Sequence, residues 1–188
     1  MRTMWMRKPR NKQAGFTLLE LLIAVSVAAV GFLATMMMFV TAITTNSRTK
    51  RDTTATLLSE TVMEQIIMAG TNGAANIPLS DCLGNNFIMN TTGAVGAAGA
   101  GAALDANGNI TFGAAAPGGG YSMNYWVCRA DGSTAQYDVR WNVREWDVAA
   151  ANVYTRIVYV STRPVGQATA QALMAPITLK GITALQSN

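Results

Sequence analysis

The chain of 188 residues contains no histidine. Without imidazole, Ser–His and Cys–His nucleophile pairs and histidine-bound metal sites are excluded. Two cysteines, Cys82 and Cys128, are too few for a thiolate zinc site and too far apart for a Cys-x-x-Cys redox motif. The sequence also has no nucleophile elbow, no phosphate loop and no carboxylate pair suited to acid–base catalysis. We therefore expect no enzyme activity, no cofactor and no metal.

Charge is scarce and unevenly placed, since only 13% of residues are charged and the net charge is +4. Residues 1–15 hold five cations and no acid: Arg2, Arg7, Lys8, Arg10 and Lys12. The remaining chain has nine cations against ten acids. The basic balance is therefore a property of the N-terminal segment, and no nucleic-acid partner is expected.

One long apolar run follows this basic segment. Residues 21–43 form 23 consecutive positions without a charge. A helix of that length extends roughly 35 Å, enough to cross a bilayer core of roughly 30 Å. The apolar core of a cleaved signal peptide spans only about 7–15 residues, and a buried core helix is the other alternative. The run predicts a single membrane-spanning helix.

Flanking cations predict the orientation of this helix. Five precede the run, while Arg48, Lys50 and Arg51 follow it beside Asp52. The excess on the N-terminal side favours an N-terminus in the cytoplasm and a body outside the inner membrane. Because that compartment is oxidising, a Cys82–Cys128 disulfide is expected.

Glu20 stands at the edge of the apolar run. A carboxylate well inside a membrane span costs about 2.5–3.5 kcal/mol unless it reaches the interface or is paired. Glu20 is therefore either an interfacial residue among lipid headgroups or a residue that awaits a cation.

The residues around Glu20 resemble the processing site of type IV prepilins and type II secretion pseudopilins. The resemblance covers residues 8–45 and lies in the basic leader, Gly15-Phe16, Thr17, Glu20 and the apolar run. It implies that prepilin peptidase removes residues 1–15 by cutting between Gly15 and Phe16, and that Phe16 is then N-methylated. It also implies assembly through the helix, with Glu20 paired to the amine of Phe16 on a neighbouring pilin.

Two features depart from this family pattern. The leader of 15 residues is somewhat long, and Met4 and Met6 are alternative starts. The apolar run also contains no proline, whereas many major pilins have one midway along this helix. A kinked or melted helix is therefore not expected here.

The remaining sequence predicts an α+β fold with a long N-terminal helix and a small antiparallel sheet packed on its second half. We expect a transmembrane and assembly helix over residues 16–44, its periplasmic continuation over 45–70, and a globular head over 71–188. Apolar positions 55, 58, 62, 66 and 69 mark one helix face, and Gly70 is a natural stop. The like-charged Glu60 and Glu64 fit a solvated face better than a contact with another subunit.

Alternating apolar residues predict strands at 121–128, 137–143 and 153–160, with a weaker one at 177–180. Residues 77–92 are expected to form a loop with an irregular strand. Residues 93–120 contain 9 glycines and 10 alanines, which predicts a mobile insertion. Within it, an Asn-Gly turn at 107–108 is a better explanation than a calcium loop. The three tryptophans of the head fit sheet packing better than a sugar-binding platform.

A second resemblance covers residues 137–162, where a Val-x-Trp-x-Val run and later alternating valines are similar to the sheet of PilV-type minor pilins. It implies a minor type IV pilus subunit that primes assembly or lies near the tip. The implied partners are prepilin peptidase, other pilins, the inner-membrane assembly platform and membrane lipid. A minor pseudopilin of a type II secretion system and a membrane-anchored periplasmic binding module are the alternatives.

Overall fold

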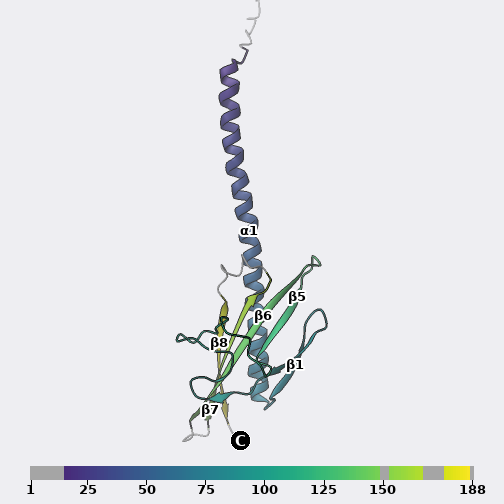
Figure 1. Ribbon diagram of the computed structural model, residues 1–188, viewed down its shortest axis with the longest axis vertical. Helices are drawn as coiled ribbons and strands as arrows, with labels where there is room; N and C mark the ends of the chain where they lie inside the picture. Colours follow the sequence, from purple (N-terminus) through teal and green to yellow (C-terminus); the bar gives the residue numbers. More distant parts are fainter. Residues whose placement is uncertain (1–14, 149–152, 167–175, 187–188) are drawn as a thin grey trace, which may run out of the picture. The chain divides into compact units, whose positions relative to one another are not determined.

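The computed structural model describes residues 15–148, 153–166 and 176–186, in which one helix precedes eight strands (Figure 1). The chain divides into two compact units, one ending at Ser47 and one beginning at Arg48. Helix α1 (Leu18–Thr71) contributes to both units. Its end lies one residue past the glycine that the sequence marked as a stop. The basic segment before Gly15 and residues 149–152 lie outside the described residues.

The second unit is built on a six-stranded sheet with the order β3-β6-β7-β8, in which β4 and β5 also pair with β6. Its long strands are β5 (Ser122–Cys128), β6 (Thr134–Val148), β7 (Val153–Pro164) and β8 (Ile177–Gln186). The pairs β5–β6, β6–β7 and β7–β8 are all antiparallel. The expected antiparallel sheet is therefore confirmed, although every strand but β5 is longer than its alternation predicts. Pro164 terminates β7 rather than interrupting it, because proline is tolerated at a strand end.

The part of α1 in this unit packs on one face of the sheet (Figure 1). The predicted helix face is confirmed: Ala55, Leu58, Val62, Ile66 and Ala69 are buried. Alternate residues of β6 meet it, with Tyr137, Val139, Trp141 and Val143 all buried in the same core. Ser59 is the one polar residue on the buried stripe, and its Oγ donates a hydrogen bond to Thr162 Oγ1 at 2.7 Å. This hydrogen bond gives the Ser59 hydroxyl a partner, and a buried hydroxyl without a partner would destabilise the fold.

Residues 76–90 form a regular hairpin rather than the expected loop with one irregular strand. Strands β1 (Asn76–Ser80) and β2 (Asn86–Asn90) pair antiparallel in a sheet of their own. Met89 is fully buried in the main core, and Ile77, Leu79 and Phe87 pack against that core. The hairpin was missed because Pro78 and the asparagines at both ends of the pair are typical of turns and weaken the strand signal.

The turn of this hairpin is organised by Asp81. Its Oδ1 accepts hydrogen bonds from the backbone N–H groups of Leu83 and Asn85. Partial burial works to raise the pKa of Asp81, but the hydrogen bonds from Asn85 and Leu83 outweigh it and hold that pKa below its ordinary value. The turn also carries Cys82, whose sulfur is bonded to that of Cys128 at the end of β5, with Cα atoms 5.8 Å apart. The disulfide thus joins the hairpin to the main sheet.

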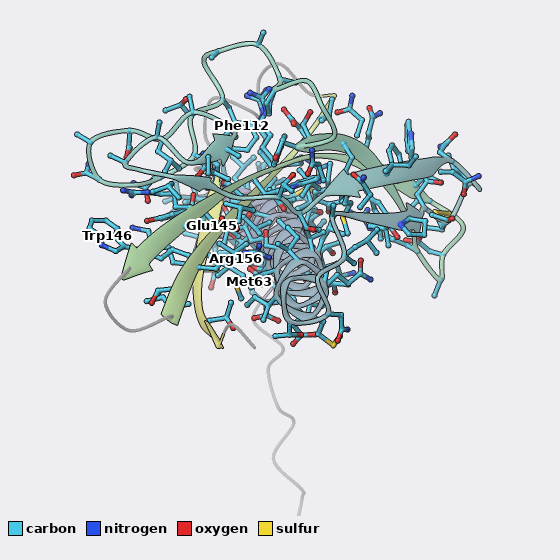
Figure 2. All side chains as sticks on the ribbon, turned by 90° about the horizontal axis from the view of Figure 1, so that it is seen from below. Met63, Phe112, Glu145, Trp146 and Arg156 are labelled. Carbon is cyan, nitrogen blue, oxygen red and sulfur yellow. A yellow bond between two sulfur atoms is a disulfide. The ribbon has the colours of Figure 1, made fainter. Side chains whose placement is uncertain are left out.

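The Gly/Ala-rich segment lies on the sheet instead of standing free of it. Strands β3 (Ala94–Val95) and β4 (Ala100–Gly101) pair with β6. A second core forms where Ala102 and Ile110 bury against Tyr159. The structure therefore has this segment on one face of the sheet and α1 on the other, and Figure 2 shows Phe112 and Met63 on these opposite sides.

The expected turn at 107–108 is present. Asp105 Oδ1 accepts hydrogen bonds from the N–H groups of Asn107 and Asn109, and Gly108 has φ +74°. Both carboxylate oxygens of Asp105 therefore accept hydrogen bonds within the turn, since Oδ2 accepts one from Asn109 Nδ2, and this agrees with the Asn-Gly interpretation. Within the described part of the chain, no group of three or more acidic or cysteine side chains is arranged to hold a metal ion.

A buried ionic cluster fastens the Gly/Ala-rich segment to β6 and β7. Asp138 accepts hydrogen bonds from Arg140 and Arg163, with N···O distances of 3.0 Å. Both guanidinium groups lie against the ring of Phe112, 4.8 and 4.5 Å from its centroid. Arg140 also donates to the carbonyl oxygen of Ala114 at 2.9 Å. These contacts replace the apolar side chains that the segment lacks.

The three tryptophans of the head have different environments. Trp141 is 1% exposed in the core, and its Nε1 donates to the carbonyl oxygen of Asn90 at 2.8 Å. Trp126 is half-buried, whereas Trp146 is 56% exposed near the end of β6. Figure 2 shows Trp146 well apart from Phe112 and Met63. Core packing is thus confirmed for Trp141, and the three do not form a common platform.

Removing the disulfide should destabilise the head. The bond closes a sequence separation of 46 residues. The chain-entropy model assigns about 4 kcal/mol to such a loop. The double variant Cys82→Ser/Cys128→Ser is expected to lose roughly that much free energy of unfolding, measured by urea denaturation of the full chain in detergent. A loss below about 1 kcal/mol would contradict a structural role for this bond.

Gly101 should not tolerate a side chain. It has φ +111°, and a Cβ at this position would overlap the carbonyl oxygen of Trp141. Gly101→Ala is therefore expected to destabilise the head by about 2 kcal/mol or more, because backbone must shift. Gly113→Ala is the matched control, since no atom lies within 4 Å of its built Cβ. Equal unfolding midpoints for the two variants would mean that β4 is not held against β6.

Candidate processing and assembly site

The Gly15–Phe16 peptide bond lies just before the first turn of α1. Residues 15–17 are not helical, and the helix begins at Leu18. Phe16 is 83% exposed, and beyond its chain neighbours no atom of the described residues lies within 4 Å of the place that a Cβ of Gly15 would take. A peptidase needs backbone that is free of helical hydrogen bonds and open to its own groups. The bond that the resemblance marks for cleavage meets both conditions in this structure.

Thr17 caps the helix. Its Oγ1 accepts a hydrogen bond from the backbone N–H of Glu20 at 3.3 Å, and its carbonyl oxygen accepts one from the N–H of Leu21 at 3.2 Å. A threonine followed three residues later by glutamate is the capping-box pattern, in which each side chain can satisfy a backbone donor at the helix start. The Thr-x-x-Glu spacing signals this role in the sequence, whereas the charge of Glu20 alone does not predict it.

Glu20 lies in the first turn of α1 and is exposed. A carboxylate there interacts favourably with the positive end of the helix dipole. Within the described residues, no ion pair engages its side chain. Glu20 therefore has a local function in starting the helix and keeps a carboxylate that is open to a cation from outside the chain.

The surface of α1 in the first unit is apolar and unpartnered. The helix is long and apolar enough to cross a membrane, and its most apolar window, of mean hydropathy 2.3, is 0% buried within the chain. Phenylalanine, leucine, isoleucine, valine and methionine side chains from residue 18 to residue 43 are more than half exposed. The alternative of a buried core helix does not fit this exposure.

The hydroxyl groups in this apolar stretch are satisfied by the helix itself. Ser26 Oγ donates to the carbonyl oxygen of Leu22 at 2.8 Å, and Thr41 Oγ1 donates to that of Met37 at 2.9 Å. Such bonds to the preceding turn allow serine and threonine to enter an apolar environment without an unpaired donor. The stretch therefore offers a continuous apolar surface, either to lipid or to other helices.

The structure thus brings the predicted site residues together in two places. Gly15 and Phe16 lie just before α1, and Glu20 lies in its first turn. Cys82 and Cys128 are joined in the head. The two groups belong to separate units of the chain.

Comparison with known proteins identifies the N-terminal segment. Residues 10–36 match the family model of the prokaryotic N-terminal methylation motif. Neither a curated protein nor a solved structure matches the chain. The matched residues contain the Gly15–Phe16 bond, the Thr17 cap, Glu20 and the first part of the apolar stretch.

This motif implies processing by prepilin peptidase and assembly with other pilins, and proteins that carry it are structural subunits. Together with the apolar helix it indicates membrane anchoring. The chain therefore carries a prokaryotic N-terminal methylation motif, which supports its placement among the type IV pilins and pseudopilins.

Proposed function

We propose that this protein is a minor subunit of a type IV pilus. The observation that carries the proposal is the methylation motif at residues 10–36, on a helix whose apolar surface is not buried by its own chain. Prepilin peptidase removes residues 1–15 and N-methylates Phe16. Residues 16–44 then act as the transmembrane and assembly helix, residues 45–70 continue it in the periplasm, and residues 71–188 form the head.

The orientation follows from the charges. Five cations before the apolar stretch hold the N-terminus in the cytoplasm, so that the head lies on the periplasmic side. An oxidising periplasm is also where a disulfide such as Cys82–Cys128 persists. From this membrane-bound state, the inner-membrane assembly platform transfers the helix from lipid to a bundle of pilin helices.

Assembly requires the charges at the helix start to be compensated. Cleavage creates an amine on Phe16, one residue before the cap, where the positive end of the helix dipole makes a cation unfavourable. In the apolar core of a filament, this amine and the carboxylate of Glu20 would each be costly alone. Pairing the amine of one subunit with Glu20 of its neighbour compensates both and sets the register between subunits.

A minor type IV pilin is favoured over a minor pseudopilin by the Val-x-Trp-x-Val run. In the structure its Trp141 is a residue of β6 that lies in the main core and donates a hydrogen bond to the carbonyl oxygen of Asn90 in β2. The resemblance to PilV-type subunits thus concerns residues that build the head. A pseudopilin would use the same processing chemistry in a filament that stays in the periplasm. A monomeric anchored binding module would have no need of Glu20 beside a cleavable Gly15–Phe16 bond.

Mass spectrometry of the mature N-terminus tests the processing step. In cells that contain prepilin peptidase, we expect a chain that begins with N-methyl-Phe16. An intact leader in those cells would refute the proposal. Shearing the cells then separates the two filament types: the subunit is expected in the released fibres, and its retention with the cells would favour a pseudopilus.

Two substitutions at Glu20 separate its charge from its role in capping. Glu20→Ala removes both, whereas Glu20→Gln keeps a side chain that can complete the capping box. If the charge is what assembly needs, both variants should insert in the membrane normally and fall by about tenfold or more in sheared fibres. Immunoblots of membrane and fibre fractions give the measurement.

Glu60→Gln is the matched control, because Glu60 is an exposed glutamate of the same helix in the second unit. It should enter fibres at the wild-type level. Normal incorporation of Glu20→Gln together with loss of Glu20→Ala would assign Glu20 to capping alone and would contradict the pairing with Phe16.

A further inference from the structure

Strand β8 forms one edge of the six-stranded sheet (Figure 1). It pairs with β7 from Ile177 to Gln186, and no second strand pairs with it among the described residues. The described pairing skips no residue, so this edge contains no bulge. A long, regular edge presents a row of unpaired backbone groups, which natural sheets usually protect.

The register of the sheet shows which residues of β8 point their backbone groups to this edge. In β6, the N–H and the carbonyl oxygen of Trp141 both bond to residues that adjoin β5 and β4, away from β7. Its β7 partner Val160 therefore bonds to the other side, where it faces Leu179 of β8. Because backbone groups alternate in direction along a strand, Leu179 bonds inward, whereas Lys180 and Ile182 point their N–H and C=O groups outward. Among the residues that the structure describes, no backbone hydrogen bond engages these outward groups.

The side chains of β8 protect this edge poorly. The strand contains no proline and one charged residue, Lys180. The Nζ of Lys180 donates to the carbonyl oxygen of Asn107 at 3.1 Å and lies 5.6 Å from the centre of the Tyr159 ring. Its charge is therefore held over the Gly/Ala-rich segment and does not extend from the edge. Ile182, two residues further on, is 72% exposed.

Helix α1 holds β8 in place from behind. Gly181 lies against Met63 and Ile67 of the helix, so closely that a side chain at this position would press on the sulfur of Met63. The strand is thus fixed by β7 on one side and by the helix on one face. An edge that is already ordered loses little conformational entropy when a further strand pairs with it.

We propose that the β8 edge receives an edge strand of another pilin subunit, which extends the sheet by antiparallel pairing. The edge itself selects this occupant, since a row of backbone donors and acceptors is matched by another extended backbone. The exposed Ile182 adds an apolar contact on the face away from α1. That the other chain is a pilin rests on the proposed function, in which pilin subunits lie side by side.

The direction of β8 argues against pairing between the β8 edges of two copies. Ser59 of α1 is bonded to Thr162 near the end of β7, whereas Gly70 lies against Arg156 near its start. This part of α1 therefore runs opposite to β7 and in the same direction as β8. Two copies whose helices run in the same direction cannot pair their β8 edges antiparallel, and parallel pairs are less stable. The occupant is therefore a strand of another subunit that runs opposite to β8.

Hydrogen exchange of the wild-type chain tests the edge at single residues. In the isolated full chain in detergent, the amides of Leu179 and Gly181 are expected to exchange about 100-fold more slowly than those of Lys180 and Ile182, because only the first two are bonded to β7. In sheared fibres, the amides of Lys180 and Ile182 should become protected as well. Mass spectrometry with fragmentation to single residues gives the measurement.

The same measurement separates the other occupants. Protection of Lys180 and Ile182 in the isolated monomer would mean that the chain covers its own edge, and would overturn the proposal. Protection that appears on concentrating the purified chain would identify a second copy and would also overturn it. A benzophenone cross-linker in place of Ile182 should join β8 to a different chain with a methylation motif, at a peptide mapped by mass spectrometry.

Ile182→Pro is the matching variant, because it removes one outward N–H and leaves the bonds to β7 in place. Proline is tolerated on an edge strand where its N–H would face away from the sheet. Ile182→Ala is the control, since it removes the apolar side chain and keeps the N–H. The two variants are expected to unfold within about 3 °C of each other, with Ile182→Pro about tenfold lower in sheared fibres.

Equal fibre levels of the two Ile182 variants would overturn the proposal. Retention of the wild type with the cells would instead refute the pilus role. The edge is then judged by hydrogen exchange in isolated membranes. Protection of Lys180 and Ile182 above that in detergent supports the proposal there, and equal exchange overturns it.

Discussion

The molecule depends on one constraint, which is an apolar helix surface that its own chain does not bury. From residue 18 to residue 43 the large side chains of α1 are exposed, and the hydroxyl groups among them are satisfied within the helix. Such a surface requires a non-aqueous environment at every stage. In the function proposed for this chain, lipid supplies it first and neighbouring helices supply it in the filament. The methylation motif lies over the start of this surface.

In the second unit, by contrast, one face of the helix is buried by its own chain. Few large apolar side chains are available on the far side of the sheet. The helix stripe from Ala55 to Ala69 and one face of β6 and β7 supply a conventional core. The other face of the sheet is covered by a segment made largely of glycine and alanine, which bring little apolar area. A cluster of Asp138, two arginines and Phe112 supplies the missing interactions there. Ionic and cation–π contacts thus hold the Gly/Ala-rich segment on the sheet, where large apolar side chains would otherwise do so.

The periodicity of apolar residues along the sequence predicted the helix face and the long strands, because each of these elements has its own repeat of buried positions. The spacing of Leu58, Val62 and Ile66 identified the buried helix face, and the alternation around Trp141 identified β6. It could not place the Gly/Ala-rich segment, because β3 and β4 are defined by pairing with β6 and not by their own side chains. The hairpin of β1 and β2 was hidden by Pro78 and by turn-forming residues. At the candidate site, the motif was readable from sequence, whereas the position of the Gly15–Phe16 bond outside the first turn of α1 is visible only in three dimensions.

The position of the Thr17 cap relative to the Gly15–Phe16 bond has one further consequence. Every group that starts the helix, including the Thr17 oxygens and the N–H of Glu20, lies on the C-terminal side of that bond. Among the described residues, the hydrogen bonds that start α1 therefore all remain if the leader is removed. In the function proposed for this chain, the precursor and the product can then share one helix, and maturation changes the charge at its beginning without requiring that helix to refold.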